Sequence, residues 1–306
     1  MRAYVLKRIL HSAVTLFGVS LVVFGILRIL PGDPAKMMLP EGASNAQVEQ
    51  LRQQLGLEEP LYVQYGIFLS SIVRGDFGRS YQFNSPARDV VGERIWPTVH
   101  LAAAAFLLTV ILGVPAGILA AAKHRTILDY GGIFLAALGQ SLPNFWLGIM
   151  MILLFGVTLG WLPTSGYEGP IYLVLPAITL AAYPTALVAR LTRSSMLEVL
   201  GKEYIRTARS KGLSERTVVA LHAVKNASIP VVTILGLQIG VLLGGAVITE
   251  SVFAWPGIGK LAVDSIFRRD FPVIQVVLIM AAAVFIVINL LVDLTYTVLD
   301  PRIRYS

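Results

Sequence analysis

Residues 98–122, TVHLAAAAFLLTVILGVPAGILAAA, decide the fold of this chain. The stretch contains no Asp, Glu, Lys or Arg. The hydrocarbon core of a bilayer is about 30 Å thick, so a spanning helix needs about 20 mainly apolar residues. Five further windows meet this requirement, at 9–30, 131–159, 171–192, 229–252 and 274–298. We therefore expect an all-α integral membrane protein with six transmembrane helices.

The composition of the 306-residue chain supports a membrane protein. Hydrophobic residues make up 56% of it and charged residues 14%, whereas soluble domains carry about 25% charged residues. This excludes a soluble enzyme and a disordered protein. The chain has no cysteine and only four histidines, none of them spaced as a pair of helical metal ligands. We expect no metal site and no cofactor bound by this chain.

The first apolar window could also be read as a signal peptide, because basic residues precede it. Its apolar stretch from Ile9 to Leu30 is longer than the roughly 7 to 15 residues of a signal-peptide core, and no small-residue cleavage site follows. We interpret residues 1–30 as a cytoplasmic tail and a retained first transmembrane helix.

The positions of the Lys and Arg residues, which give the chain its net charge of +7, indicate its orientation in the membrane. Eight Lys and Arg residues lie between 190 and 225, and none lies between 160 and 170. By the positive-inside rule, the loop 193–228 and both termini, including the tail 299–306, are cytoplasmic. The even number of predicted helices agrees with two cytoplasmic ends.

Segment 31–97 is expected to be a small folded cap on the extracytoplasmic side. Its six basic and eight acidic residues make it too polar for lipid. Ser44 can cap a helix that begins near Asn45 and ends at Gly56, and residues 61–73 predict a second amphipathic helix. The predicted protein thus has a helical insertion after its first helix, followed by a transmembrane core at 98–298.

The cytoplasmic loop 193–228 predicts two short amphipathic helices, with a break at Gly212 and a helix cap at Ser214. The predicted apolar face of the first helix consists of Met196, Leu197, Leu200, Tyr204, Ala208 and Lys211. The basic residues could lie against anionic lipid headgroups. Alternatively, the apolar face could enter a groove of a cytoplasmic protein. The spacing alone leaves both interpretations open.

Ordered motifs along nearly the whole chain resemble one family. They are ILPGDP (29–34), QLGLEEPLYVQY (54–65), GDFGRS (75–80), ARLTRSSMLEVL (189–200), EYIRTARSKGLSERTVVALHAVKNASIPVV (203–232), ITESVFAWPGIGKL (248–261), RRDFPVIQ (268–275) and DPRIRY (300–305). The sequence resembles permease subunits of ATP-binding-cassette (ABC) importers, in the branch that serves dipeptides, oligopeptides, glutathione and nickel. Residues 203–232 resemble the EAA motif loop of these permeases.

The resemblance implies a type I importer fold and a permease that forms half of a translocation pathway in the bacterial plasma (inner) membrane. The implied partners are a second homologous permease in a heterodimer, two ATPase subunits that bind ATP and Mg, an extracytoplasmic substrate-binding protein and membrane lipid, with no nucleic acid. Short peptides are the expected substrate, with glutathione and nickel as alternatives. The residues implied to couple to the ATPases are Leu197, Leu200, Glu203, Tyr204, Ala208, Gly212 and Ser214.

The chain carries no ATPase motif of its own. A P-loop needs GxxxxGK followed by Ser or Thr, and the Gly-Lys pairs at 201–202 and 259–260 lack both the first glycine and the hydroxyl residue. We therefore expect a non-catalytic subunit. An ion-coupled secondary transporter is a remote alternative, because it would need several ionisable residues at mid-membrane depth, and Asp293 is almost the only candidate.

Segment 250–272 is apolar but too irregular to span. The resemblance favours a dip into the outer mouth of the pathway, where protein or water must cover the backbone. The alternative is a surface hairpin with Trp255 anchored at the membrane interface. The candidate pathway or outer-mouth residues are Glu250, Trp255, Pro256, Gly257 and Asp293. We expect Glu250 to be interfacial, Arg28 to extend to the outer headgroups, and Asp293 to line the pathway or to bond to a neighbouring helix.

Overall fold

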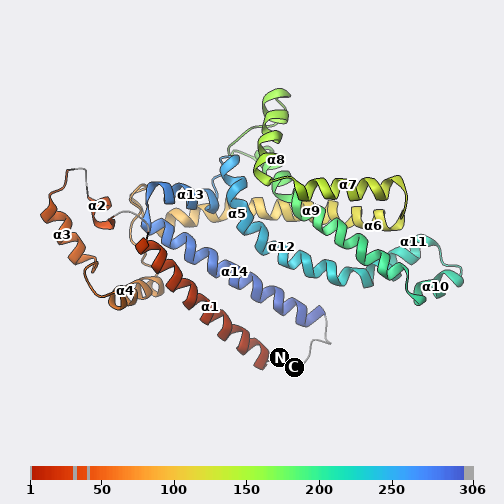
Figure 1. Ribbon diagram of the computed structural model, residues 1–306, viewed down its shortest axis with the longest axis horizontal. Coiled ribbons are helices and arrows are strands. Elements are labelled where there is room, and N and C mark those ends of the chain that lie inside the picture. Colours follow the sequence, from red (N-terminus) through yellow and green to blue (C-terminus); the bar gives the residue numbers. More distant parts are fainter. Residues whose placement is uncertain (1, 30–32, 40–41, 300–306) are drawn as a thin grey trace. The chain divides into compact units, whose positions relative to one another are not determined.

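The computed structural model of the protein describes residues 2–29, 33–39 and 42–299 (Figure 1). Apart from one isolated β-bridge between Arg79 and Pro86, regular structure in this part of the chain is helical. The elements, with π-helical segments written η, are α1 (Arg2–Ile29), α2 (Pro34–Met38), α3 (Asn45–Gln54), α4 (Leu61–Arg74), α5 (Ala87–Leu108), η1 (Thr109–Gly113), α6 (Val114–Ala122), α7 (Ile127–Ser141), α8 (Asn144–Met151), η2 (Ile152–Thr158), α9 (Pro170–Leu200), α10 (Glu203–Ser210), α11 (Glu215–Thr217), η3 (Val218–Ala223), α12 (Val224–Val252), α13 (Ile258–Arg268) and α14 (Phe271–Leu299).

The predicted all-α membrane architecture is confirmed. Five helical stretches are long and apolar enough to cross a membrane, and a bent helix pair makes a sixth candidate. The five stretches are Leu10–Ile29, Ala87–Ala122, Pro170–Leu200, Glu215–Gly244 and Phe271–Ile288.

The predicted span over 131–159 is sharply bent. Its sequence forms two helices, Ile127–Ser141 and Asn144–Thr158, which meet at an angle of 103°. Leu142 at the break is in the extended region, with ψ of 127°. Pro143 explains this geometry, because its ring disfavours a helical conformation at the preceding residue and it has no N–H to continue the helix.

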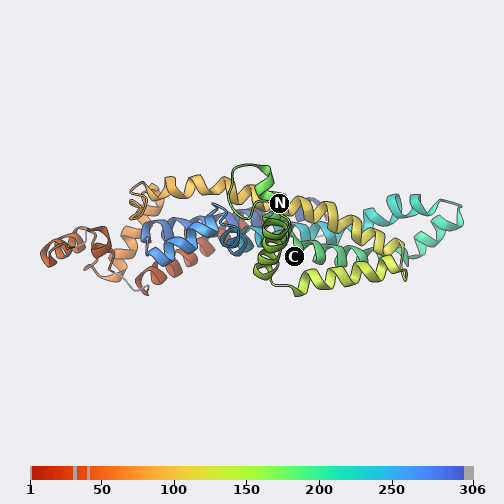
Figure 2. The ribbon, with the colours of Figure 1, turned by 90° about the horizontal axis from the view of Figure 1, so that it is seen from above.

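The described residues form two compact units, one within 2–96 and 260–290 and the other within 97–259 and 291–299. In the second unit α9 is the central helix and packs against α6, α7, α8 and α12. Figures 1 and 2 both show α6 and α7 running alongside it. Small residues allow the close approach, since a Cβ added to Gly117 would lie only 2.5 Å from the carbonyl oxygen of Ala189.

The first unit contains the two helices predicted after α1. The Ser44 side chain caps α3 in a capping box with Gln47, as the sequence predicts. Asp33 caps α2 and accepts hydrogen bonds from the Arg52 Nε and Nη2 atoms at 3.1 and 2.5 Å, which ties α2 to α3. Helix α4 packs on α1, where the Tyr65 hydroxyl lies 2.8 Å from the Ser20 hydroxyl.

Two sequence motifs of the first unit meet at a buried carboxylate. Asp270 is 1% exposed and accepts a hydrogen bond from the Ser80 hydroxyl at 2.5 Å. The backbone N–H of Tyr81 donates to the other carboxylate oxygen at 3.3 Å. These hydrogen bonds therefore connect the GDFGRS and RRDFPVIQ motifs. Burial, and then the charge of Asp270, raises the pKa of Tyr81 to about 12.

Candidate functional site

The segment between α9 and α12 is a helical hairpin that we call the coupling hairpin, residues 203–223. Its turn depends on Gly212, which has φ of +79°, in the left-handed region that favours glycine. The Ser214 hydroxyl accepts a hydrogen bond from the Thr217 N–H at 3.3 Å and so caps α11. The predicted glycine break and serine cap are both confirmed.

The inner side of the coupling hairpin is part of a hydrophobic core that reaches three long helices. Ile205 and Val218 are fully buried, and Ala208 is nearly so. Their cluster also contains Ala121 of α6, Met196 of α9, Ala223 of η3 and Ala227 of α12. Leu197 and Leu200 pack against the same cluster. The hairpin is therefore packed against the ends of α6, α9 and α12.

The predicted single apolar face from Met196 to Lys211 is wrong. Helix α9 ends at Leu200 and α10 begins at Glu203, so the interruption at 201–202 changes the helical phase. As a result Ile205, which the sequence pattern missed, is buried, whereas Tyr204 is 43% exposed and Lys211 is exposed. Leu197 and Leu200 are half-buried and Ala208 is buried against other parts of this chain, and their contact with an ATPase stays a prediction.

The second helix of the hairpin is not short, contrary to expectation. Helix α11 continues through η3 into α12, and Glu215–Gly244 forms one candidate span. The predicted helix start at Ser214 is correct, and the predicted fifth span, 229–252, lies within the continuous helix that starts there. The candidate spanning helix therefore begins inside the hairpin.

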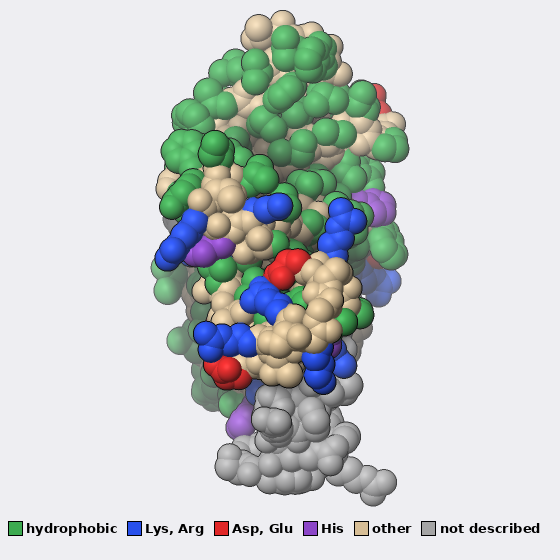
Figure 3. All heavy atoms as spheres, turned by 90° about the vertical axis from the view of Figure 1, so that its right-hand side faces the viewer, with side chains coloured by type: hydrophobic (Ala, Val, Ile, Leu, Met, Phe, Trp, Pro, Cys, Tyr) green, Lys and Arg blue, Asp and Glu red, His purple; other side chains and the backbone are tan. Residues whose placement is uncertain are grey.

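The outer surface of the hairpin combines exposed apolar side chains with charges. Leu213 at the turn is 40% exposed and Leu221 is 67% exposed. Glu203 lies in the first turn of α10 and pairs with Arg206 at 2.9 Å. Figure 3 views this end of the molecule, and Lys and Arg side chains stand out from it. This is the surface that a cytoplasmic partner could contact.

An ion pair closes the hairpin across its glycine turn. Arg209 Nη2 and Nε donate to the two Glu215 carboxylate oxygens at 2.7 and 3.1 Å. The hydrogen bond to Glu215 raises the pKa of Arg209, against the opposing effect of burial. The two arms of the turn are thereby held together at their base.

A buried carboxylate anchors the neighbouring turn between α6 and α7 to α9. Asp129 is 1% exposed, and its carboxylate accepts hydrogen bonds from Arg193 Nε at 2.5 Å and Nη2 at 2.9 Å. The backbone N–H of Arg125 donates to it at 2.9 Å, and His124 Nδ1 lies 3.0 Å away. The sequence pattern does not reveal this cluster, because its acid and its arginine are 64 positions apart.

Two of the outer-mouth candidates, Glu250 and Gly257, belong to a second buried polar cluster. Glu250 is fully buried and accepts a hydrogen bond from the Thr98 hydroxyl at 2.6 Å. The same hydroxyl accepts from the Ile258 N–H at 2.8 Å. A Cβ on Gly257 would overlap the Glu250 carboxylate, so glycine is required for this close approach. Glu250 is therefore buried within the protein, and its place at the level of the membrane interface stays a prediction.

Trp255 is part of the protein core. It is 2% exposed, and its indole Nε1 donates to the Pro97 carbonyl oxygen at 2.8 Å. The alternative of a surface hairpin with Trp255 at the membrane interface is therefore wrong. Pro256 beside it is half-buried. Asp293 lies on α14, but its side chain falls outside the described residues, as does the DPRIRY motif.

Comparison with known proteins agrees with this architecture. The family model of the binding-protein-dependent transport system inner membrane component matches residues 113–305, and the model of the N-terminal part of such membrane components matches 1–102. The chain belongs to this family. It is the multi-pass membrane permease subunit of an ABC importer, and such subunits lie in the inner membrane of bacteria.

Two curated relatives match over the full length. The chain is 42% identical to the dipeptide transport system permease protein DppB of Alkalihalophilus pseudofirmus, with 100% of both chains covered. It is 46% identical to the glutathione transport system permease protein GsiC of Escherichia coli (strain K12), with 99% of both chains covered. The chain is thus a relative of dipeptide and glutathione permeases, which are non-catalytic membrane subunits.

Solved structures share the fold of the core. A chain of the inward-facing MetNI methionine ABC transporter matches with a TM-score of 0.57 and 17% identity, covering 69% of this chain and 96% of the solved one. A chain of an amino acid ABC transporter matches with a TM-score of 0.55 and 16% identity, covering 68% and 92%. Each solved chain is matched over almost its whole length, and the match covers about two thirds of this chain. This chain therefore has segments that the solved chains lack.

Proposed function

We propose that the chain forms one half of the pathway of a short-peptide importer and that its coupling hairpin receives the motion of ATPase subunits. One observation carries the proposal. The buried side of the hairpin belongs to the same core as the ends of α6, α9 and α12, and its outer side exposes Leu213 and Leu221. The hairpin therefore has one surface for a partner and another that is fixed to the membrane helices.

The proposed mechanism follows from close packing. When two partner ATPases close on ATP and Mg, each pushes the hairpin of its permease. Ile205 and Val218 have no solvent-exposed surface, and packed interiors move as blocks because they resist compression. The push is then transmitted to α9 and α12, and the two permeases rock between inward and outward openings. A substrate-binding protein delivers the cargo from the other side.

The proposed orientation keeps the coupling hairpin and both termini in the cytoplasm. The α3–α4 region then lies outside, toward the binding protein. Basic residues on the hairpin and on the α6–α7 turn support this orientation. The second permease is proposed to be a homologous but different chain, and the outer-mouth role of Glu250, Trp255, Pro256, Gly257 and Asp293 stays a prediction.

Short peptides are the proposed substrate. The printed names of the full-length relatives are dipeptide and glutathione permeases, and glutathione is itself a small peptide. Both names support this choice over nickel, the third alternative. The test is uptake of a labelled dipeptide, glutathione and nickel by cells that carry the complete transporter. Nickel uptake without dipeptide or glutathione uptake would overturn the proposed substrate.

Gly212→Asp tests the coupling role. A Cβ at Gly212 meets no atom within 4 Å, so the variant adds a carboxylate at the hairpin tip at a backbone cost of about 1–2 kcal/mol. We expect the purified complex to lose most of its peptide-stimulated ATPase activity and transport, while the chain stays in the membrane. Gly160→Asp is the matched control, because Gly160 also has positive φ and an open Cβ position. Equal transport by both variants would contradict the coupling role.

A further inference from the structure

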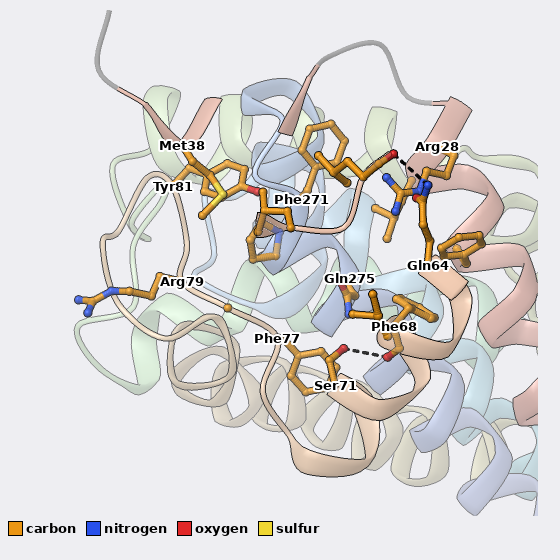
Figure 4. Close-up of a pocket in the computed structure, with 17 residues that line it drawn as sticks. Arg28, Met38, Gln64, Phe68, Ser71, Phe77, Arg79, Tyr81, Phe271 and Gln275 are labelled. Atoms are coloured by element: carbon orange, nitrogen blue, oxygen red, sulfur yellow. Dashed lines mark hydrogen bonds between the residues drawn. The ribbon is translucent and has the colours of Figure 1, made fainter. Parts of the chain in front are cut away.

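A cleft of about 240 Å³ opens in the first unit beside the end of α1 (Figure 4). Its walls come from α1, α4, the 77–81 segment and the start of α14, and the aromatic rings of Phe24, Phe68, Phe77 and Phe271 line it. The lining contains two arginines and no acidic residue. The cleft is therefore apolar in its walls and positive in charge.

Arg28 is the cation that the cleft offers to a ligand. Its guanidinium carbon lies 5.2 Å from the centre of the Phe24 ring. Within the described part of the chain no carboxylate is within ion-pair distance of Arg28. The other arginine of the lining, Arg79, donates Nη2 to the Asn84 carbonyl oxygen at 2.6 Å, and Figure 4 shows its side chain directed away from the cleft.

The α4 wall of the cleft is held in place by contacts within the chain. Gln64 Nε2 donates to the Leu57 carbonyl oxygen at 3.0 Å and to the Glu59 carbonyl oxygen at 2.6 Å. Phe24 of α1 packs against Phe68 of α4 with ring centres 5.5 Å apart. A ligand would therefore enter a formed cleft and would not have to order it.

The position of the cleft identifies the kind of ligand. Phe24, Leu27 and Arg28 are in the last two turns of Leu10–Ile29, the first candidate span. The end of a spanning helix lies where hydrocarbon gives way to headgroups, and arginine extends to that level. An apolar cleft with one available guanidinium at this depth has the two features of a phospholipid site, since Arg binds phosphate oxygens with paired N–H groups.

We propose that this cleft holds one anionic phospholipid, with its phosphate on Arg28 and part of an acyl chain between the aromatic walls. The lack of any acidic residue in the lining favours an anionic headgroup over a zwitterionic one. The proposal rests on α1 spanning a membrane and not on the peptide substrate or the coupling hairpin. In the orientation proposed above, the site lies in the outer leaflet.

The test uses the full chain, in whatever complex it is purified, in nanodiscs of equal parts phosphatidylglycerol and phosphatidylcholine with identical acyl chains. Lipids that stay bound after transfer to detergent are identified by native mass spectrometry. We expect the wild-type protein to retain phosphatidylglycerol in preference to phosphatidylcholine. Arg28→Gln should weaken phosphatidylglycerol retention about tenfold, the size of one lost charge-assisted interaction.

Two further variants separate the site from general effects. Arg74→Gln removes an exposed arginine at the end of α4 that does not line the cleft, so it should retain lipid as the wild type does. Ser71→Phe adds a ring inside the cleft and should reduce retention of both lipids. Equal phosphatidylglycerol retention by the Arg28 and Arg74 variants would overturn the proposal. So would cross-linking from position 28 to a partner protein in place of lipid.

Discussion

The Asp129 carboxylate allows the strongest prediction about the packing near the coupling hairpin. The side chain is 1% exposed and receives two hydrogen bonds from Arg193, whose own side chain is 21% exposed. Asp129→Ala removes the acceptor for both bonds and leaves a cation without its partner. Breaking a buried ion pair in this way costs about 3–5 kcal/mol. Because Arg193 keeps some contact with solvent, we expect the lower value, about 3 kcal/mol.

The loss can be measured as a change in thermal stability of the detergent-solubilised protein. A chain of this size loses about 2 °C in melting temperature per kcal/mol, so Asp129→Ala should melt about 6 °C lower. Size-exclusion chromatography after heating gives the melting temperature. The double variant Asp129→Ala/Arg193→Ala should lose less than the sum of the single losses, because the two side chains form one interaction.

An exposed ion pair provides the matched control. Glu203 and Arg206 are 84% and 72% exposed, and such surface pairs contribute little to stability. Glu203→Ala should therefore leave the melting temperature unchanged. A melting temperature for Asp129→Ala within about 1 °C of the wild type, or strict additivity in the double variant, would refute the reasoning.

Two further predictions concern helix packing and pH. A Cβ on Gly117 would lie 2.5 Å from α9 atoms, whereas a Cβ on Gly131 meets nothing within 4 Å. Gly117→Ala should therefore lower the free energy of unfolding by about 2 kcal/mol through overpacking. Gly131→Ala, the control, should not lower the melting temperature. Burial opposes ionisation of Asp33, but the hydrogen bonds from Arg52 and from the Ala35 N–H prevail and hold its pKa below the ordinary value. With the folded pKa below the unfolded one, the stabilisation is complete above about pH 4 and is lost as pH falls through the lowered pKa. Hydrogen exchange of α3 should therefore be slower in the wild type than in Asp33→Asn at pH 6. This difference in exchange rate should vanish in acid. A difference that persists unchanged in acid would contradict the lowered pKa of Asp33.

Features that depend on neighbours in the sequence were predictable. The Ser44 cap of α3, the turn at Gly212 and the Ser214 cap each involve contacts within about four residues, and all three agree with the structure. The apolar windows also placed the membrane helices, because hydrophobic length alone determines whether a helix can span.

Features that depend on distant partners were not predictable from one sequence. The burial of Glu250 was not predictable, because its partner Thr98 lies 152 positions earlier. Ile205 was missed because a two-residue interruption after Leu200 shifts the helical phase, which a continuous periodicity does not register. The 103° bend at Pro143 could not be predicted from the proline alone, because many proline-containing spans continue with only a kink.

The central claim is that this permease moves its cargo with energy from partner ATPases. It is tested most directly by purifying the chain from its native membrane in mild detergent, identifying what stays bound, and reconstituting the result in liposomes. We predict recovery of a second permease and of P-loop ATPases, with ATP hydrolysis and dipeptide uptake both raised by an external binding protein. A lone chain that transports solute in ATP-free liposomes would contradict the account.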